Sequence, residues 1–522
     1  MPDATQHHRP TRRRFALPWQ GVVLAAAFVG WGLYLLARYD QPVTLGLAAL
    51  GAVALLLVTW CLSSRGPSGG TWGFAAALCV GGLAFLLAFT PGTVPDEQYH
   101  YNASYKYADV LLGRSVGDDF ITMRADDAAL EKELDRERLD RSAYDFVASN
   151  ATPLVRDASL VRQEVDSSYD FTANLPQQKL ASVLGIALGQ VLGLGSVVTF
   201  YLGRLCSLAL YGALAIAAVR LIPLGKNLIA AVALLPMSLH VAASYSYDGP
   251  TLGLALLFVS LLVRAVRGGG LLEGGELVAL GVTALLLAPC KVVYVLLLFG
   301  IFLVPRKRFA SVRQEWLLKV GVILLAFAAI FLLRLPTFLE ASGMAQSGLD
   351  VRDGEAGSFY TVGGLLAEPV KTALLFLRSC EVLGAFWLET MVGGRLAWFQ
   401  EELITPLWLT LPLFLLLGLS CVEAPDDRGT LTRCQRAVMG AVFVAVFGAL
   451  LVTFATTYTF DDELVILGLQ GRYLLPALPC ALLAIRGTLL SSDRPMGPVV
   501  AAGLCATSLF TLLRLVSLAL TL

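Results

Sequence analysis

Apolar runs that approach the length of a membrane-spanning helix recur along most of this chain. A helix needs about 20 predominantly apolar residues to cross the hydrocarbon core of a bilayer. The 522 residues are 57% hydrophobic and 15% charged, with a mean hydropathy of +0.70, whereas soluble domains carry about 25% charged residues. The sequence therefore predicts an all-α polytopic integral membrane protein and excludes a soluble one.

The charge pattern predicts how these runs are threaded. Basic loops stay on the cytoplasmic side, so the basic tail of residues 1–15 is placed inside, and we expect a multi-pass protein of the inner (cytoplasmic) membrane. Residues 91–178 hold 17 acidic and 9 basic residues and are placed outside, as a large first loop with surface helices. Three transmembrane helices are expected within 16–90. The rest of the bundle is expected within 179–522, with a second external loop near 337–366.

About 13 spans, within a range of 11–15, follow from this threading. Segments 179–195 and 367–390 can span or re-enter, since half-depth segments are tolerated where they line a cavity. The charge rule favours the re-entrant or interfacial alternative for 179–195. The expected spans lie at about 16–37, 43–62, 73–90, 196–222, 227–246, 250–267, 276–289, 291–305, 316–335, 403–420, 436–457, 472–490 and 497–521.

Several kinds of chemistry lack their usual motifs. The chain has no G-x-x-x-x-G-K-[ST] phosphate-binding loop, so ATP-driven transport has no support. Its nine cysteines form no C-x-x-C pair and none lies in the large loop, while histidine occurs four times. A disulfide framework and a His-rich metal centre are therefore unsupported, and no nucleic-acid partner is expected.

The start of the large loop, TVPDEQYH, holds the leading site candidates, the catalytic set Asp96, Glu97 and His100. A carboxylate where a helix leaves the membrane can act as a general base. Asp96 and Glu97 could instead hold a divalent cation, Mg²⁺ or Mn²⁺. A capping box at Thr93-x-x-Asp96 is the structural alternative. His100 follows Asp96 by one turn, which suits an orienting hydrogen bond or an ordinary i,i+4 polar pair.

Two further candidates border apolar runs. Tyr101 belongs to a tyrosine-rich series within residues 99–107, which is typical of an interfacial belt but could also stack on a sugar. Asp248, in YSYDGP, is an acid at the end of an apolar helix. Such acids are usually functional or paired, although an N-cap for the following span is equally open.

Two cations complete the candidate substrate-binding set. Lys291, in APCKVVY, either snorkels or binds an anionic headgroup. Arg472, followed by Tyr473 in QGRYLLPALP, enters the bilayer from the outer side. The guanidinium fork of arginine suits a lipid phosphate, and pairing with a nearby acid is the alternative.

The ordered series PDEQYH, SYDGP, K-V-V-Y and GRYLLP resembles a bacterial family of predicted polytopic membrane proteins without an assigned function. That family has PDE-x-x-H, SYD and GRY-x-x-P motifs, and the resemblance covers most of the chain from about residue 75. Its layout is similar in turn to GT-C glycosyltransferases. The resemblance implies a GT-C-like bundle, with Asp96 as base or metal ligand, Glu97 beside it, Asp248 and Lys291 lining the cavity and Arg472 on a donor phosphate. The chain departs from that layout in having two spans before the one that enters the loop.

The expected function is an integral-membrane glycosyltransferase. It would move a sugar from a polyprenyl-phosphate donor to a glycan, lipid or protein acceptor of the cell envelope, on the outer face and in contact with membrane lipid. A transporter or flippase of lipid-linked sugars is the first alternative, although no internal repeat is visible and paired repeats are common in such folds. A non-catalytic envelope-assembly protein, with the acidic loop as a docking surface, is the second.

Overall fold

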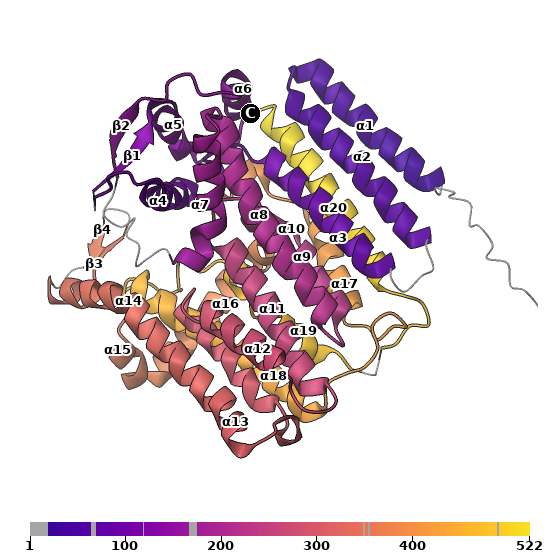
Figure 1. Cartoon of the computed structure of the whole chain (residues 1–522), viewed down its shortest axis with the longest axis vertical. Coiled ribbons are helices and arrows are strands. Elements are labelled where there is room, and N and C mark those ends of the chain that lie inside the picture. The colour runs from indigo at the N-terminus through magenta and orange to yellow at the C-terminus, as the bar shows by residue number, and fades with distance from the viewer. Residues whose placement is uncertain are drawn as a thin grey trace, which may run out of the picture.

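The computed structural model describes residues 19–63, 69–117, 119–165, 175–347, 350–352, 355–487 and 490–522. Within these ranges the protein is an all-α polytopic membrane protein (Figure 1). Seven helices are long and apolar enough to cross a bilayer, and shorter apolar helices accompany them. The expected fold class is confirmed, and the figure of about 13 spans stays a prediction. The basic tail of residues 1–15 lies outside the described residues, as does Asp353 of the expected second loop.

The first part of the bundle is built from long helices that pack side by side. Helices α1 and α2 form a hairpin, and α3 and α20 pack against α2, so the first three helices and the last one lie side by side (Figure 1). The bounds are α1 Trp19–Tyr39, α2 Pro42–Ser63, α3 Gly69–Ala88, α8 Ser196–Leu221, α11 Asp248–Arg267, α12 Gly274–Leu287 and α20 Gly497–Ala519.

The second part of the bundle contains further helices and short connecting elements. Their bounds are η4 Arg306–Arg308, α13 Val312–Trp316, the π-helical turn η5 Leu317–Gly321, α14 Val322–Ser347, β3 Asp350–Arg352, β4 Glu355–Gly357, α15 Val362–Ala367, α16 Pro369–Val392, η6 Glu401–Leu403, α17 Leu407–Ser420 and α18 Arg433–Thr457. The charged helix α16 covers the ambiguous segment 367–390 and is not among the long apolar helices.

Besides the expected span at 316–335, which begins with the π-helical turn η5, three expected spans are not single α-helices. Segment 227–246 is divided into α9 (Lys226–Leu234) and α10 (Pro236–Ala242), because a proline inside a helix removes a backbone donor. Segment 472–490 contains a 3₁₀ turn, η7 (Gly471–Leu474), before α19 (Leu478–Ile485). Segment 291–305 forms the 3₁₀ helix η3 (Val292–Leu303). A 3₁₀ helix rises about 2.0 Å per residue, so these 12 residues extend about 24 Å, more than an α-helix of equal length.

The large first loop folds into a compact layer over one end of the bundle (Figure 1). Its helices are short, and the two strands β1 and β2 lie among them. Strands β1 and β2 pair antiparallel, from Phe120 opposite Glu164 to Arg124 opposite Leu160. The elements are α4 Glu97–Leu111, β1 Phe120–Arg124, α5 Ala125–Glu131, η1 Leu134–Arg136, α6 Arg141–Asn150, β2 Leu160–Glu164 and α7 Pro176–Val191. We call this end of the bundle the α4 end.

Helix α7 keeps both of its ends near the α4 end. Near its start, Gln178 donates to Thr251 in the first turn of α11. After its last turn, the backbone of Gly193 accepts from Val155 of the large loop. Between these points α7 packs along α8 and α4. The layer formed by the large first loop is therefore fixed to the membrane bundle through contacts along the length of α7.

Candidate functional site

Arg472 joins two acids that are far from it in the sequence. Its Nη2 donates to Asp96 Oδ2 at 3.3 Å, and its Nε lies 3.5 Å from Asp248 Oδ2. The Nε is buried and has no hydrogen-bond partner within the described residues. The side chains of Arg472 and Asp248 are 5% and 10% exposed, whereas that of Asp96 is 55% exposed. The group is therefore a buried pair with one carboxylate at its solvent-facing edge.

Lys291 is a second cation that contacts Asp248. Its Nζ lies 3.1 Å from Asp248 Oδ1 and 3.6 Å from the centre of the Tyr473 ring. The Tyr473 hydroxyl accepts from Arg472 at 3.2 Å, and its ring stacks on Phe454. We call Asp96, Asp248, Lys291, Arg472 and Tyr473 the Arg472 cluster.

The cluster is assembled from separate parts of the chain. Asp248 is the first residue of α11, Lys291 directly precedes η3, and Arg472 and Tyr473 lie within η7. The close approach of η7 to α16 depends on Gly471, because a Cβ at that position would lie 1.7 Å from the carbonyl oxygen of Trp387. The 3₁₀ turn therefore sets the guanidinium against the start of α11.

Asp96 does not cap its helix in the way that the Thr93-x-x-Asp96 pattern predicts. Helix α4 begins at Glu97, and Asp96 at the N-cap position has φ 61° and makes no side-chain cap. Thr93 donates instead to the carbonyl of Thr90 at 2.7 Å. The N-cap role that was one alternative for Asp248 is also absent, because Asp248 lies inside the first turn and Tyr247 precedes the helix. Both carboxylates are thus available to the cluster.

Glu97 faces away from the cluster and is fully buried. Arg204 Nε donates to its Oε1 at 2.8 Å, and a second, shorter contact joins Arg204 Nη2 to its Oε2. The backbone N–H groups of Gly92 and Tyr245 also donate to the carboxylate. With both oxygens committed to these donors, Glu97 has a structural place rather than the catalytic one suggested by the sequence.

One family model matches this chain, over residues 79–481, and is described as "Predicted membrane protein (DUF2142)". The chain belongs to the DUF2142 family. The matched region of this DUF2142 protein contains every member of the Arg472 cluster. No curated protein and no solved structure matches the chain.

His100 lies beside the cluster rather than on Asp96. Its ring packs edge-on against Tyr99 and Tyr247, with centroids 5.3 and 4.7 Å away. Burial, followed by the charges of Lys179, Arg472 and Lys291, lowers the pKa of His100 well below its usual value. The imidazole is therefore neutral at pH 7, and its Nδ1 has no hydrogen-bond partner within the described residues.

Tyr101 does not reach the cluster. It is fully buried in a small second core, where its ring packs against Phe200, Tyr245 and Tyr105. Tyr105 is buried there as well and donates to Asp127 at 2.7 Å. These two tyrosines therefore join the loop layer to α8, and the interfacial belt and the sugar-stacking role are both incorrect for Tyr101.

The predicted metal site does not fit the geometry. Glu97 is paired with Arg204, and Asp96 turns the other way toward Arg472. Across the described ranges, no group of three or more His, Cys, Asp and Glu side chains could hold an ion. A Mg²⁺ or Mn²⁺ ion would need several oxygen ligands, and the carboxylates of Asp96 and Glu97 do not meet at one place to supply them.

Three cations near the site were not singled out from the sequence. Arg204, inside the apolar helix α8, pairs with Glu97, and Lys179 donates to the carbonyl oxygens of Tyr245 and His100. Arg334 of α14 donates to the carbonyls of Pro289 and Cys290, directly before Lys291. A charged residue inside an apolar run is the signal that identifies such positions, and Arg204 and Arg334 both show it.

The cations outnumber the acids around the cluster. Lys291, Arg472 and the nearby Lys179 act on His100, and Arg334 lies beside Lys291. The acids in contact with the cluster's cations are Asp96 and Asp248, since the neighbouring acid Glu97 is paired with Arg204. An excess of positive charge with a buried, incompletely satisfied guanidinium favours an anion, and a phosphate is well matched to arginine. The arrangement can thus hold an anionic group next to an exposed carboxylate.

Proposed function

We propose that this protein is an integral-membrane glycosyltransferase that moves a sugar from a polyprenyl-phosphate donor to a cell-envelope acceptor on the outer face. The observation that supports it best is the convergence of Asp96, Asp248, Lys291 and Arg472, which lie in separate parts of the chain, at the α4 end. An acid can act as a general base toward an acceptor hydroxyl, and cations beside it can stabilise a leaving phosphate.

In the proposed reaction the bond between the sugar's anomeric carbon and the phosphate oxygen breaks, and a bond to the acceptor oxygen forms. Arg472 and Lys291 stabilise the negative charge that the lipid phosphate carries as it leaves. Asp96 takes the proton of the acceptor hydroxyl. A bound phosphate competes for Arg472, and this frees the Asp96 carboxylate to accept a hydrogen bond from the acceptor.

The group of supporting residues differs from the set expected from the sequence. Asp248 bridges Lys291 and Arg472 and keeps the two cations close together. Tyr473 accepts from the guanidinium and lies under the Lys291 ammonium. We therefore assign Asp96 as the base and Lys291, Arg472 and Tyr473 as the donor-binding residues, with Asp248 as a positioning residue.

A flippase of lipid-linked sugars is the second candidate, because the break between α9 and α10 is of a kind found in transporters. Here the Ser238 hydroxyl donates to the carbonyl of Val232 at the break, and the residues around it are buried and apolar. The break is therefore part of the packed core. The charged groups lie instead at the end of the bundle, which favours the transferase.

The substitution Asp96→Asn tests the proposal. A general base contributes about 10²–10⁴-fold, so we expect transfer from a polyprenyl-phosphate-linked sugar to fall at least about 100-fold, with an unchanged melting temperature. Asp119→Asn, at a side chain that is 73% exposed, is the matched control and should keep full activity. Full transfer by the Asp96→Asn protein would remove Asp96 from the mechanism. Lipid flipping without donor turnover would favour the second candidate.

A further inference from the structure

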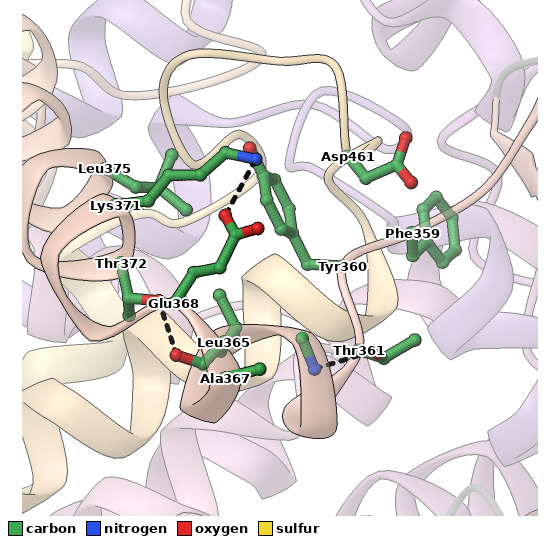
Figure 2. Close-up of a pocket in the computed structure, with 11 residues that line it drawn as sticks. Phe359, Tyr360, Thr361, Leu365, Ala367, Glu368, Lys371, Thr372, Leu375 and Asp461 are labelled. Carbon is green, nitrogen blue, oxygen red and sulfur yellow. Dashed lines mark hydrogen bonds and ion pairs between the residues drawn. The ribbon is translucent and has the colours of Figure 1, made fainter.

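A separate cavity of about 240 Å³ lies between the start of α16, helix α15 and residue Asp461. Figure 2 shows Lys371 and Glu368 reaching toward one another beside the ring of Tyr360, with Asp461 on the far side of that ring. Thr361 and Thr372 add hydroxyl groups to the wall. No part of the Arg472 cluster lines this cavity.

The walls of the cavity are fixed by hydrogen bonds before any ligand binds. The segment before α15 pairs with the segment after α18, through Asp461 N to the carbonyl of Ser358 at 2.8 Å and Tyr360 N to that of Thr459 at 3.3 Å. The Tyr360 hydroxyl donates to the carbonyl of Glu463 at 2.7 Å. The aromatic wall therefore has a set orientation, and little ordering is needed on binding.

The cavity is lined by more acids than cations, whereas the Arg472 cluster has two acids and two cations, with the further cation Lys179 nearby. Lys371 lies 3.1 Å from Glu368, while Asp461, Asp462 and Glu463 all lie close enough to act on the Tyr360 hydroxyl. One cation against several acids disfavours a phosphate. The Lys371–Glu368 pair offers both donors and acceptors at 70% and 59% exposure, which suits a ligand with many hydroxyl groups.

We propose that this cavity binds a single neutral saccharide unit. Its volume lies below the range of about 300–1,000 Å³ typical of drug-sized ligands, which excludes a polyprenyl chain and suits one sugar ring. The ring of Tyr360 supplies an apolar face, and the ion pair and hydroxyl groups around it supply hydrogen bonds. The proposal rests on the proposed function only in regarding this saccharide as part of the acceptor.

The cavity and the Arg472 cluster lie at opposite ends of α16. Leu375 lines the cavity, and Thr390 accepts from the backbone of Gly471 beside Arg472. Fifteen helical residues separate them, or about 22 Å at 1.5 Å per residue. Between the cavity and the cluster, segment 458–470 runs alongside α16, and Ile466 N donates to Ser379 Oγ of that helix at 2.8 Å. An acceptor of several sugar units would be long enough to reach both places.

The test is saturation-transfer NMR on the full chain in lipid nanodiscs, without glycoside detergents. The probes are the methyl glycosides of glucose, galactose, mannose and N-acetylglucosamine, with inorganic phosphate and Ca²⁺ as competitors. We expect at least one glycoside to bind, and its signal to fall at least about five-fold in Tyr360→Ala and in Lys371→Met. Tyr360→Phe, which keeps the aromatic face, should retain most of the signal.

Arg378→Gln, an exposed residue of the same helix, is the matched control and should bind as the parent protein does. Absence of binding for all four glycosides, equal binding by the Lys371→Met protein, or displacement of the glycoside by Ca²⁺ would each overturn the proposal. The binding measurement needs no donor. If the Asp96→Asn protein still binds the glycoside, or if the protein proves not to be a transferase but binds it, the saccharide site is supported independently of the proposed function.

Discussion

Asp96 and Glu97 are neighbours in the chain, yet their carboxylates have different surroundings. Glu97 is buried with Arg204, which also donates to the carbonyls of Phe89 and Thr90. Asp96 faces solvent and Arg472. At the level of single residues, one acid therefore holds the loop against the bundle, and the other is free for chemistry.

Removing the charge of Glu97 should destabilise the fold rather than alter a reaction. Breaking a buried ion pair costs about 3–5 kcal/mol because the remaining charge is left without a partner. We expect Glu97→Gln to lower the melting temperature of the purified protein by several degrees. The double substitution Glu97→Leu with Arg204→Met should recover part of that loss. A Glu97→Gln protein as stable as the parent would contradict the structural assignment.

Asp109, on the last turns of α4, should make stability depend on pH. It is fully buried, accepting from Thr122 N at 2.9 Å and Arg114 at 3.2 Å. Burial, only partly opposed by these donors, raises its pKa from 3.8 to about 7. The folded state then binds a proton that the unfolded state has lost between about pH 4 and 7, so stability falls as pH rises through this window.

Thermal unfolding from pH 4.5 to 7.5 measures this dependence. The decrease in melting temperature with rising pH should be smaller in Asp109→Asn, because the amide has no proton to lose. Asp135→Asn, an exposed acid of the same layer, is the control and should follow the parent curve. If the curve of the Asp109→Asn protein has the parent's slope, Asp109 is not the group responsible.

Among the elements, η7 matters most to the cluster, since it carries both Arg472 and Tyr473 and packs against α16. Its backbone approaches α16 so closely that Gly471 leaves no room for a side chain. Gly471 N also donates to Thr390 Oγ1 at 2.8 Å. The position of the guanidinium is thus set by packing outside the cluster.

Gly471→Ala should impair the site without altering any member of it. A Cβ there would lie 1.7 Å from the carbonyl oxygen of Trp387 and 2.6 Å from Met391 N, so η7 must shift away from α16. Such overpacking costs about 1–3 kcal/mol. We expect a lower melting temperature and at least a ten-fold loss of transfer. Gly448→Ala in α18 meets nothing within 4 Å and should behave as the parent.

At the level of elements, the sequence could predict which polar motifs lie at helix ends, but not how the elements pack on one another. The structure brings together polar motifs that the sequence made noticeable, because they stand at the ends of apolar runs, where ionisable residues are rare. The directions of side chains could not be predicted. The tyrosine-rich series indicated an interfacial belt or a sugar-stacking role for Tyr101, but its burial depends on the large-loop layer packing on α8, a contact between segments about 100 residues apart. Glu97 was misassigned for the same reason, since its partner Arg204 lies on α8.

At the scale of the whole molecule, the start of α1 and the C-terminus lie toward opposite ends of the bundle. Figure 1 shows the C-terminus beside α6, within the loop layer, and the start of α1 at the other end. Two contacts agree with the figure, since Arg514 near the end of α20 donates to Leu403, and Gln400 accepts from Leu139 just before α6. The C-terminus and the Arg472 cluster should therefore share one side of the membrane.

Reporter fusions test this arrangement. Alkaline phosphatase, which is active only outside the cytoplasm, should be active when fused after Leu522 and inactive when inserted in the turn at residues 268–273 between α11 and α12. A cytoplasmic fluorescent reporter should give the opposite pattern. Equal activity at the two positions would contradict the threading. The reverse order would contradict it too, and would place the Arg472 cluster on the cytoplasmic side.

The segment from Gly92 to Glu97, directly before α4, is closed into a short ring by a hydrogen bond between its two ends. The Glu97 carboxylate accepts from Gly92 N at 3.1 Å, and the carbonyl of Gly92 accepts from Trp398 Nε1 at 3.1 Å. Gly92 has φ 79°, and a Cβ there would lie 2.4 Å from the carbonyl oxygen of Leu134. Asp96 is carried on this ring, so the number of residues between Gly92 and Glu97 is fixed more strictly than their identity. A single inserted residue would turn Asp96 away from Arg472 while leaving every side chain of the motif in the sequence.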